Sequence, residues 1–158
     1  MASGWVVKAT GDLDGDAKAD IIWQDATSGD VAVWLMAGVG MSAGNYIARD
    51  IPGNWQIRAA EDFDGDGKAD LLWQDTTTGD VAIWLMNGLS ITGGSYAAHG
   101  IPDNWRLRAV ADYNGDAKAD ILWQDTTTGD VAVWLMDGTN IASGGYATRG
   151  LSSEWEPI

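Results

Sequence analysis

Aspartate side chains recur at alternate positions in a short stretch near the middle of the chain. Asp62, Asp64 and Asp66 are followed by Asp70, and Gly65 lies between the second and the third of these aspartates. Oxygen ligands from every second residue allow a short loop to enclose Ca²⁺, which takes roughly six to eight oxygen ligands and tolerates irregular geometry. The stretch therefore predicts a loop that binds a hard divalent cation.

The same loop occurs three times, each copy fifty residues from the next. The other two copies have these acidic and amide residues: Asp12, Asp14, Asp16 and Asp20 in the first, and Asp112, Asn114, Asp116 and Asp120 in the third. Clustered carboxylates repel one another unless a cation neutralises them. This repulsion favours a bound metal over the simpler alternative, a solvated Asp-Gly turn.

An EF-hand is the nearest alternative metal loop. Its glycine stands at the sixth position and a glutamate at the twelfth. Here Gly65 is the fourth residue counted from Asp62, and the twelfth is Trp73. The flanking segments also have the composition of strands, so the loop is not predicted to join two helices.

The whole unit repeats, not only the acidic loop. Tryptophans are in register at three positions of the unit: Trp5, Trp55, Trp105 and Trp155; Trp23, Trp73 and Trp123; Trp34, Trp84 and Trp134. A fixed period of this size is typical of propellers and solenoids. We expect units at residues 1–54, 55–104 and 105–154, with residues 155–158 opening a truncated fourth repeat.

Four strands are expected in each unit. In the second unit, residues 55–60, 71–74, 81–86 and 91–98 are rich in apolar and β-branched residues, and glycine-containing turns separate them. Residues 81–86 are apolar on both alternating faces, as in a strand covered by layers on each side. Four short antiparallel strands per unit predict an all-β fold, a β-propeller with three four-stranded blades in this chain.

Composition excludes several classes of protein. The formal charge is −14 and the nine basic residues are scattered, so nucleic acid is not an expected partner. Without cysteine there are no disulfides, thiol catalysis or thiolate metal sites. No apolar run approaches the length of a membrane span, and Met1–Gly4 does not have the charged-then-apolar pattern of a leader, so we expect any export signal to have been removed. Because extracellular calcium is millimolar and suits open loops, we expect an extracellular or secreted protein.

The segment Asp62–Trp73 resembles the calcium loop and following strand of FG-GAP repeats, also called VCBS-type repeats, and the resemblance covers all three units. The family includes the propeller of integrin α chains, seven-bladed fungal lectins and many bacterial exported proteins. Trp73-Gln74 stands where the family has Phe-Gly, and no Gly-Ala-Pro follows it.

The resemblance implies Ca²⁺ as the cofactor and assigns its ligands. The first, third, fifth and ninth loop positions supply side-chain oxygens, and the seventh, which is Lys18, Lys68 or Lys118, supplies its carbonyl. Since Asn114 removes one charge, we expect the third loop to bind calcium most weakly.

An enzyme is not expected. His99 is the only histidine, and its equivalents in the other units are Arg49 and Arg149. The loop carboxylates are expected to bind a metal. They are therefore not the pair of carboxylates across a substrate cleft that glycoside hydrolysis requires. The sequence shows no nucleophile paired with a general base.

Two functions from different classes remain, a multivalent carbohydrate-binding protein and a calcium-stabilised structural or adhesion scaffold. A designed or reconstructed repeat array is a third possible origin, because the repeats are nearly identical. Repeated tryptophans are first of all packing residues, but those that open each unit stand at a strand edge where blades meet. In the lectin hypothesis Trp5, Trp55 and Trp105 stack on sugar rings, and the residues that hydrogen-bond the hydroxyls are Asn54, Asn104, Arg58 and Arg108.

The number of blades predicts self-assembly. Propellers typically need about four to eight blades to close, so three blades leave apolar faces exposed at both ends. Two chains would make a six-bladed ring around a two-fold axis, which we prefer over a nine-bladed trimer. The repeat of the opening strand at Trp155 suggests overlap with the partner.

Overall fold

The computed structural model describes residues 3–152 and 154. These residues contain twelve β-strands and no helix, so no helix among them could span a membrane. The strands form three four-stranded antiparallel sheets, each following the chain order. The predicted all-β fold with three four-stranded blades is confirmed. The fourth partial unit at residues 155–158 lies outside the described residues.

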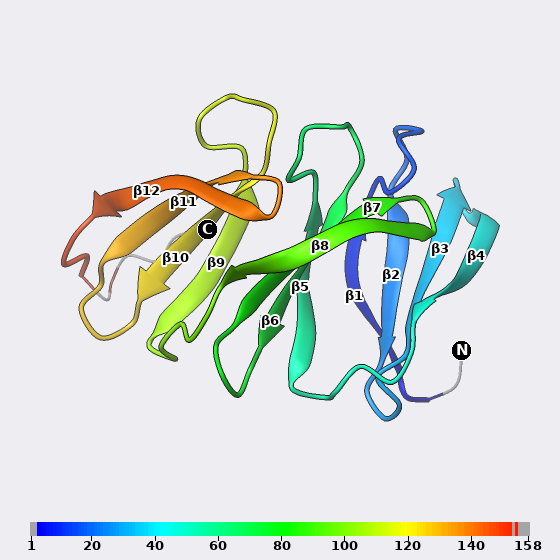
Figure 1. The fold of residues 1–158 in the computed structure, drawn as a ribbon, viewed down its shortest axis with the longest axis horizontal. Helices are drawn as coiled ribbons and strands as arrows, with labels where there is room; N and C mark the ends of the chain where they lie inside the picture. The colour runs from blue at the N-terminus through cyan, green and yellow to red at the C-terminus, as the bar shows by residue number, and fades with distance from the viewer. Residues whose placement is uncertain (1–2, 153, 155–158) are drawn as a thin grey trace.

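Each sheet is one blade, and Figure 1 shows the three blades side by side. The first contains β1 (Trp5–Gly11), β2 (Asp20–Asp25), β3 (Val31–Ala37) and β4 (Gly40–Ala48). The second contains β5 (Trp55–Glu61), β6 (Asp70–Asp75), β7 (Val81–Asn87) and β8 (Ser90–Ala98). The third contains β9 (Trp105–Ala111), β10 (Asp120–Asp125), β11 (Val131–Asp137) and β12 (Asn140–Thr148).

The turn between the second and third strands of each blade requires glycine. Gly79 has a φ of +80°, and a Cβ there would collide with the carbonyl of Ile101 in the segment that leads to the next blade. Only glycine meets both conditions. The Ile101 amide donates to the Gly79 carbonyl at 3.2 Å, so the turn also guides the chain from one blade to the next.

The core lies between blades. Alternate residues of the middle strands point to opposite faces of a sheet, so blade 2 contributes to two separate hydrophobic clusters. Leu71, Trp73 and Met86 pack toward blade 1, whereas Leu72 and Ile83 pack toward blade 3. The middle blade is therefore buried on both faces, as predicted for its third strand.

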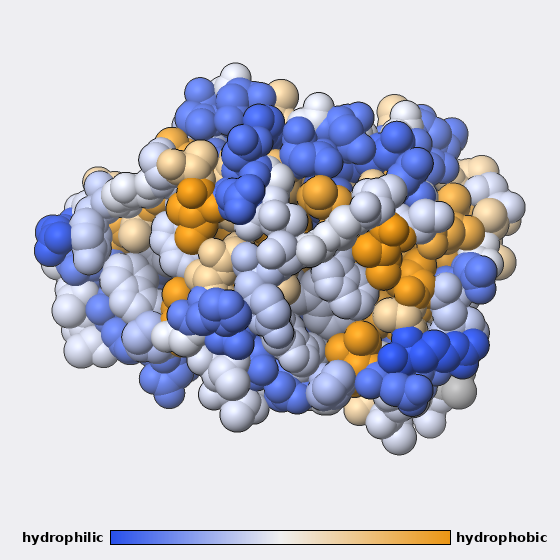
Figure 2. Space-filling model, viewed as in Figure 1, coloured by the Kyte–Doolittle hydropathy of each residue, from blue (hydrophilic) through white to orange (hydrophobic). Residues whose placement is uncertain are grey.

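The three acidic loops lie at the same end of the molecule, at the top of Figure 1. Hydrophilic residues gather along this end in Figure 2. Neighbouring loops are joined directly, because the Ala69 amide of the second loop donates to the Asp12 carbonyl of the first at 2.6 Å. The second and third loops are joined in the same way, by Ala119 and Asp62 at 2.7 Å.

Candidate functional site

The last aspartate of each loop is buried and connects the loop to the sheet. One oxygen of Asp70 accepts from the Phe63 amide at the start of the loop, and the other accepts from the Met86 amide at the end of β7, both at 2.9 Å. Asp20 and Asp120 make the corresponding pairs of bonds. This carboxylate therefore fixes the loop relative to the blade.

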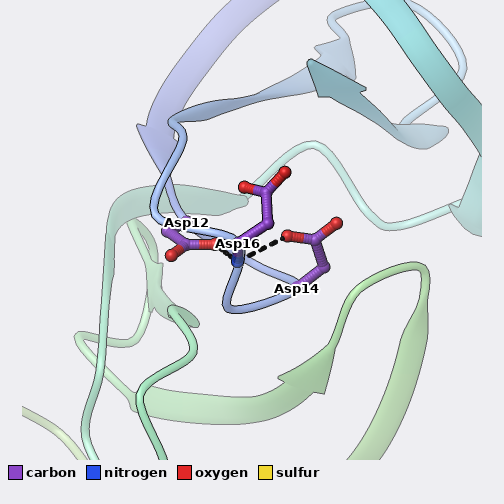
Figure 3. A group of neighbouring side chains, drawn as sticks. All are labelled: Asp12, Asp14 and Asp16. Carbon is purple, nitrogen blue, oxygen red and sulfur yellow. Dashed lines mark hydrogen bonds between the residues drawn. The ribbon is translucent and has the colours of Figure 1, made fainter. Parts of the chain in front are cut away.

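The first aspartate of each loop orders the turn itself. The Asp12 carboxylate accepts from the amides of Gly15 at 2.7 Å and Ala17 at 2.8 Å. Both Asp12 and Asp14 accept from the Asp16 amide at 3.1 Å, and Figure 3 shows their carboxylates converging on it. The backbone thus wraps around the acidic side chains.

Two of the loops bring three carboxylates together. One carboxylate oxygen from each of Asp12, Asp14 and Asp16 lies within 4.8 Å of the other two, and the same holds for Asp62, Asp64 and Asp70. In the part of the chain that the structure describes, the third loop forms no such group of three. There Asn114 donates to Asp116 at 3.4 Å instead. A donor set made of oxygen atoms fits Ca²⁺.

Some of the loop carboxylates are in an environment that disfavours their charge, whereas hydrogen bonds from the loop amides lower the pKa of Asp112. Burial raises the pKa of Asp70 to about 7, and the charges of Asp64 and Asp66 add to the shift, against the two amide hydrogen bonds. Burial and the neighbouring carboxylates also raise the pKa of Asp64, as they do for Asp14 in the first loop. A bound cation would remove this penalty.

The loop lysines have different surroundings. Lys18 pairs with Asp16 of its own loop at 2.7 Å, and this pairing lowers the pKa of the Asp16 carboxyl. Lys118 pairs with Asp137 at 2.8 Å. The stem of Lys68 packs over Gly15 of the first loop.

An aromatic pocket lies beside the segment that enters the second blade and another beside the segment that enters the third. Their volumes are about 340 and 400 Å³. The aromatic walls are Trp55, Trp73, Trp84 and Tyr96 in the first, and Trp105, Trp123, Trp134 and Tyr146 in the second. Both volumes are at the lower end of the range of small-molecule sites, roughly 300–1,000 Å³.

The deepest tryptophans of these pockets are packing residues. Trp73 and Trp123 are each only 1% exposed. Their ring centroids lie 4.6 Å from that of Trp84 and 4.9 Å from that of Trp134. Their indole nitrogens are buried, and no described residue accepts a hydrogen bond from them. The aromatic surface left for a ligand therefore comes from the half-buried tryptophans and the tyrosines.

A larger and more polar groove of about 590 Å³ lies between blades 2 and 3. Trp105 lines it together with three arginines, Arg58, Arg106 and Arg108. The Nε atoms of Arg58 and Arg108 donate to the glutamine side chains of their own blades, at 3.2 and 2.9 Å. Three of the nine basic residues of this acidic chain therefore lie in one groove.

The two junctions differ in the residues that meet there. At the first junction the Lys8 ammonium donates to Gln56, and Gln24 donates to the Trp55 carbonyl at 3.0 Å. The residues equivalent to Lys8 and Gln56 are Arg58 and Arg106, two like charges that cannot pair. Consistently, β5 and β9 pack less closely than β1 and β5.

The groove unites some of the predicted ligand residues and leaves others out. Trp105, Arg58 and Arg108 line it together. Asn54 instead donates to Asp75 at 2.8 Å, and Asn104 forms the same bond with Asp125. Each of these asparagines lowers the pKa of its aspartate partner. Their side chains anchor turns.

The remaining predicted aromatic residues lie in the pockets or at their margins. Trp55 lines the pocket of blade 2. Trp5 packs against Tyr46 with ring centroids 5.7 Å apart. His99 is exposed and stacks on Tyr96 at 4.5 Å.

Sequence reasoning did not find Arg106, Trp84 or Tyr96 as candidates. Arg106 could have been found by comparing the repeats, because Gln56 and Val6 hold its position in the other units. The tryptophans and tyrosines recur in every unit, so periodicity alone could not distinguish pocket walls from packing.

Comparison with known proteins agrees with this architecture. The model of the FG-GAP-like repeat family matches residues 12–73 and again 62–123, which together are more than half of the chain. The loops and the four-stranded blades are thus those of a propeller-type repeat, and the chain belongs to the FG-GAP-like repeat family. Neither the curated proteins nor the solved structures gave a match.

Proposed function

We propose that this chain is a non-catalytic, calcium-binding propeller module that binds carbohydrate in the groove between blades 2 and 3. The observation that carries the carbohydrate proposal is the union of Trp105 with Arg58, Arg106 and Arg108 in that groove. A sugar ring is apolar on one face and polar at its edge, so an indole beside hydrogen-bond donors suits it. FG-GAP repeats are typically extracellular, where glycans and millimolar calcium are both present.

Calcium has a structural role in this proposal. Asp62, Asp64 and Asp70 would hold the ion in the second loop, and the carboxylates of the first loop would do so there. The ion would neutralise the clustered carboxylates and stabilise the loops that join neighbouring blades. We expect no reaction to be catalysed at these sites.

The arginines favour acidic carbohydrate. A guanidinium group binds a carboxylate through two parallel hydrogen bonds. Three of them in one groove therefore suit a glycan that carries carboxylate groups, such as one containing uronic acids. The acidic side chains that share the groove, Asp75 and Asp103, would disfavour a ligand of uniformly high negative charge.

A glycan array probed with the protein in calcium tests this proposal. We expect binding to acidic glycans, and Trp105→Ala should abolish it. Trp55→Ala is the matched control, because the equivalent junction is bridged by the Lys8 and Gln24 hydrogen bonds and lacks the arginine pair. No binding across the array, or equal loss in both variants, would contradict the proposed site and favour the scaffold alternative.

The double substitution Arg58→Lys with Arg106→Gln sharpens the test. It places at the second junction the same residue pair, a lysine and a glutamine, that forms a hydrogen bond across the first junction between Lys8 and Gln56. The variant should fold at least as stably as the natural chain and should lose glycan binding. Retained binding would show that the groove is not the site.

A further inference from the structure

The contact between neighbouring blades is built twice in this chain with the same atoms. At the first junction the Gly88 amide of blade 2 donates to the Leu13 carbonyl of blade 1 at 2.7 Å, next to the bond between Ala69 and Asp12. At the second junction the Gly138 amide donates to the Phe63 carbonyl at 2.8 Å. At each of the two junctions, a donor face of the later blade therefore contacts an acceptor face of the earlier blade.

Side chains repeat the same arrangement. A Cβ placed on Gly15 would lie 3.4 Å from Lys68, and one placed on Gly65 would lie 3.3 Å from Lys118. The first and second loops are thus each covered by the lysine of the next loop. Gly115 of the last loop has no atom within 4 Å of that position among the described residues.

Among the described residues, no following blade covers the acceptor face of blade 3. We call it the Tyr113 face, formed by Tyr113 and by Leu122 and Val133, whose equivalents in blade 2 pack toward blade 3. Tyr113 is 44% exposed, whereas its equivalents Leu13 and Phe63 are fully buried by the following blade. The carbonyl groups of Asp112 and Tyr113 correspond to those that accept inter-blade hydrogen bonds elsewhere.

The donor face of blade 1 is open in the complementary way. We call it the Val7 face, formed by Val7, Ala19, Trp23 and Val39. Val7 is 47% exposed and its equivalent Ile57 only 2%. Val39 is fully exposed, whereas its equivalent Leu89 packs against the core between blades 1 and 2.

We propose that the Tyr113 face of one chain packs against the Val7 face of a second copy, twice around a two-fold axis, so that two chains close a six-bladed ring. The two open faces are the two halves of a contact that the chain already makes internally, so their shapes and hydrogen-bonding groups match. Two copies give a number of blades inside the usual range of about four to eight, and three copies exceed it. Closure also removes the exposed apolar faces at both ends.

The second copy would also complete an aromatic pocket. Trp5, Trp34 and Tyr46 correspond to pocket walls of the other blades, in which Ile51–Pro52 or Ile101–Pro102 supply one side. Met1 and Ala2, which hold that position before blade 1, lie outside the described residues. Leu151 and Ser152 hold that position after blade 3, and the Leu151 amide makes the same turn bond, to Gly129 at 3.0 Å. In the ring this segment would stand beside Trp5 of the second copy.

This inference does not depend on carbohydrate binding, and the mass of the assembly in solution tests it. Sedimentation equilibrium in calcium should give twice the chain mass of 16.8 kDa. Tyr113→Lys and Val7→Glu each alter one open face at a position that is exposed in the single chain, so each variant should fold as a monomer. Ile91→Lys, at a similarly exposed position on β8 of the middle blade, should remain a dimer.

If the unsubstituted chain has the mass of one copy at micromolar concentration, the proposal is overturned. A mass that grows without limit would also overturn it, because an open polymer is not a closed ring. Circular dichroism of the two face variants shows whether they fold. The measurement on the natural chain keeps the test decisive if they do not.

Discussion

At the residue scale, the sixth loop position carries backbone strain in two of the three units. Ala17 and Ala117 have φ values of 68° and 67°, and the equivalent residue of the second unit is Gly67 with a φ of 85°. A left-handed conformation costs an L-residue roughly 1–2 kcal/mol, whereas glycine adopts it freely. The first and third loops therefore hold a residue that the conformation disfavours.

Replacing Ala117 with glycine should stabilise the chain. The strain energy that is relieved exceeds the entropic stabilisation that glycine gives the unfolded chain. We therefore expect a gain of about 0.5–1 kcal/mol in the free energy of unfolding. Urea unfolding in excess calcium measures it. Gly67→Ala is the reverse control and should destabilise by a similar amount. A loss of stability in Ala117→Gly would contradict the strain argument.

At the element scale, Asp70 connects the acidic loop to β7, and its environment makes the metal-free protein sensitive to pH. Its folded pKa of about 7 lies above its ordinary value. The folded state therefore binds more protons than the unfolded chain between about pH 4 and pH 7, and stability falls as pH rises through this window. The lowered pKa values of Asp75 and Asp125 act only at more acidic pH.

We therefore expect the melting temperature in chelator to be lower at pH 7.5 than at pH 5. Calcium binds the ionised carboxylate, so the stabilisation by added calcium should increase over the same range. Thermal unfolding followed by circular dichroism at both pH values, with and without calcium, measures both effects. Asp70→Asn should remove most of the pH dependence in chelator. A metal-free protein that gains stability from pH 5 to pH 7.5 would refute this interpretation of Asp70.

The strands and loops were predictable because their signals are local and repeated. Residues 71–74 and 81–86 are apolar runs bounded by turns, and both lie in observed strands, β6 and β7. The directions of the arginine side chains were not predictable. Arg58 is the unpaired residue of a β-bulge between Ile57 and Ala59, which interrupts the alternation along β5 and leaves Arg58 exposed. The groove depends on such local irregularity and on the meeting of Arg58 with Arg106 from another blade.

At the scale of the whole molecule, the proposed calcium binding would be linked to blade packing. The Asp12 carbonyl accepts from Ala69, so the first residue of one loop is held by the next loop. An ion that orders a loop therefore also orders the junction between blades. The formal charge of −14 adds a general repulsion that bound cations would reduce.

The melting temperature with calcium and with chelator tests the central claim, that these blades form a calcium-binding propeller module. Calcium that binds only the folded chain stabilises the folded state by about 2.7 kcal/mol per site when the calcium concentration is one hundred times the Kd. We predict a clear rise of the melting temperature in calcium, reversed by chelator, with a smaller rise in Asp64→Ala and an unchanged one in the control Thr77→Ala. A melting temperature that is the same in calcium and in chelator would contradict the account.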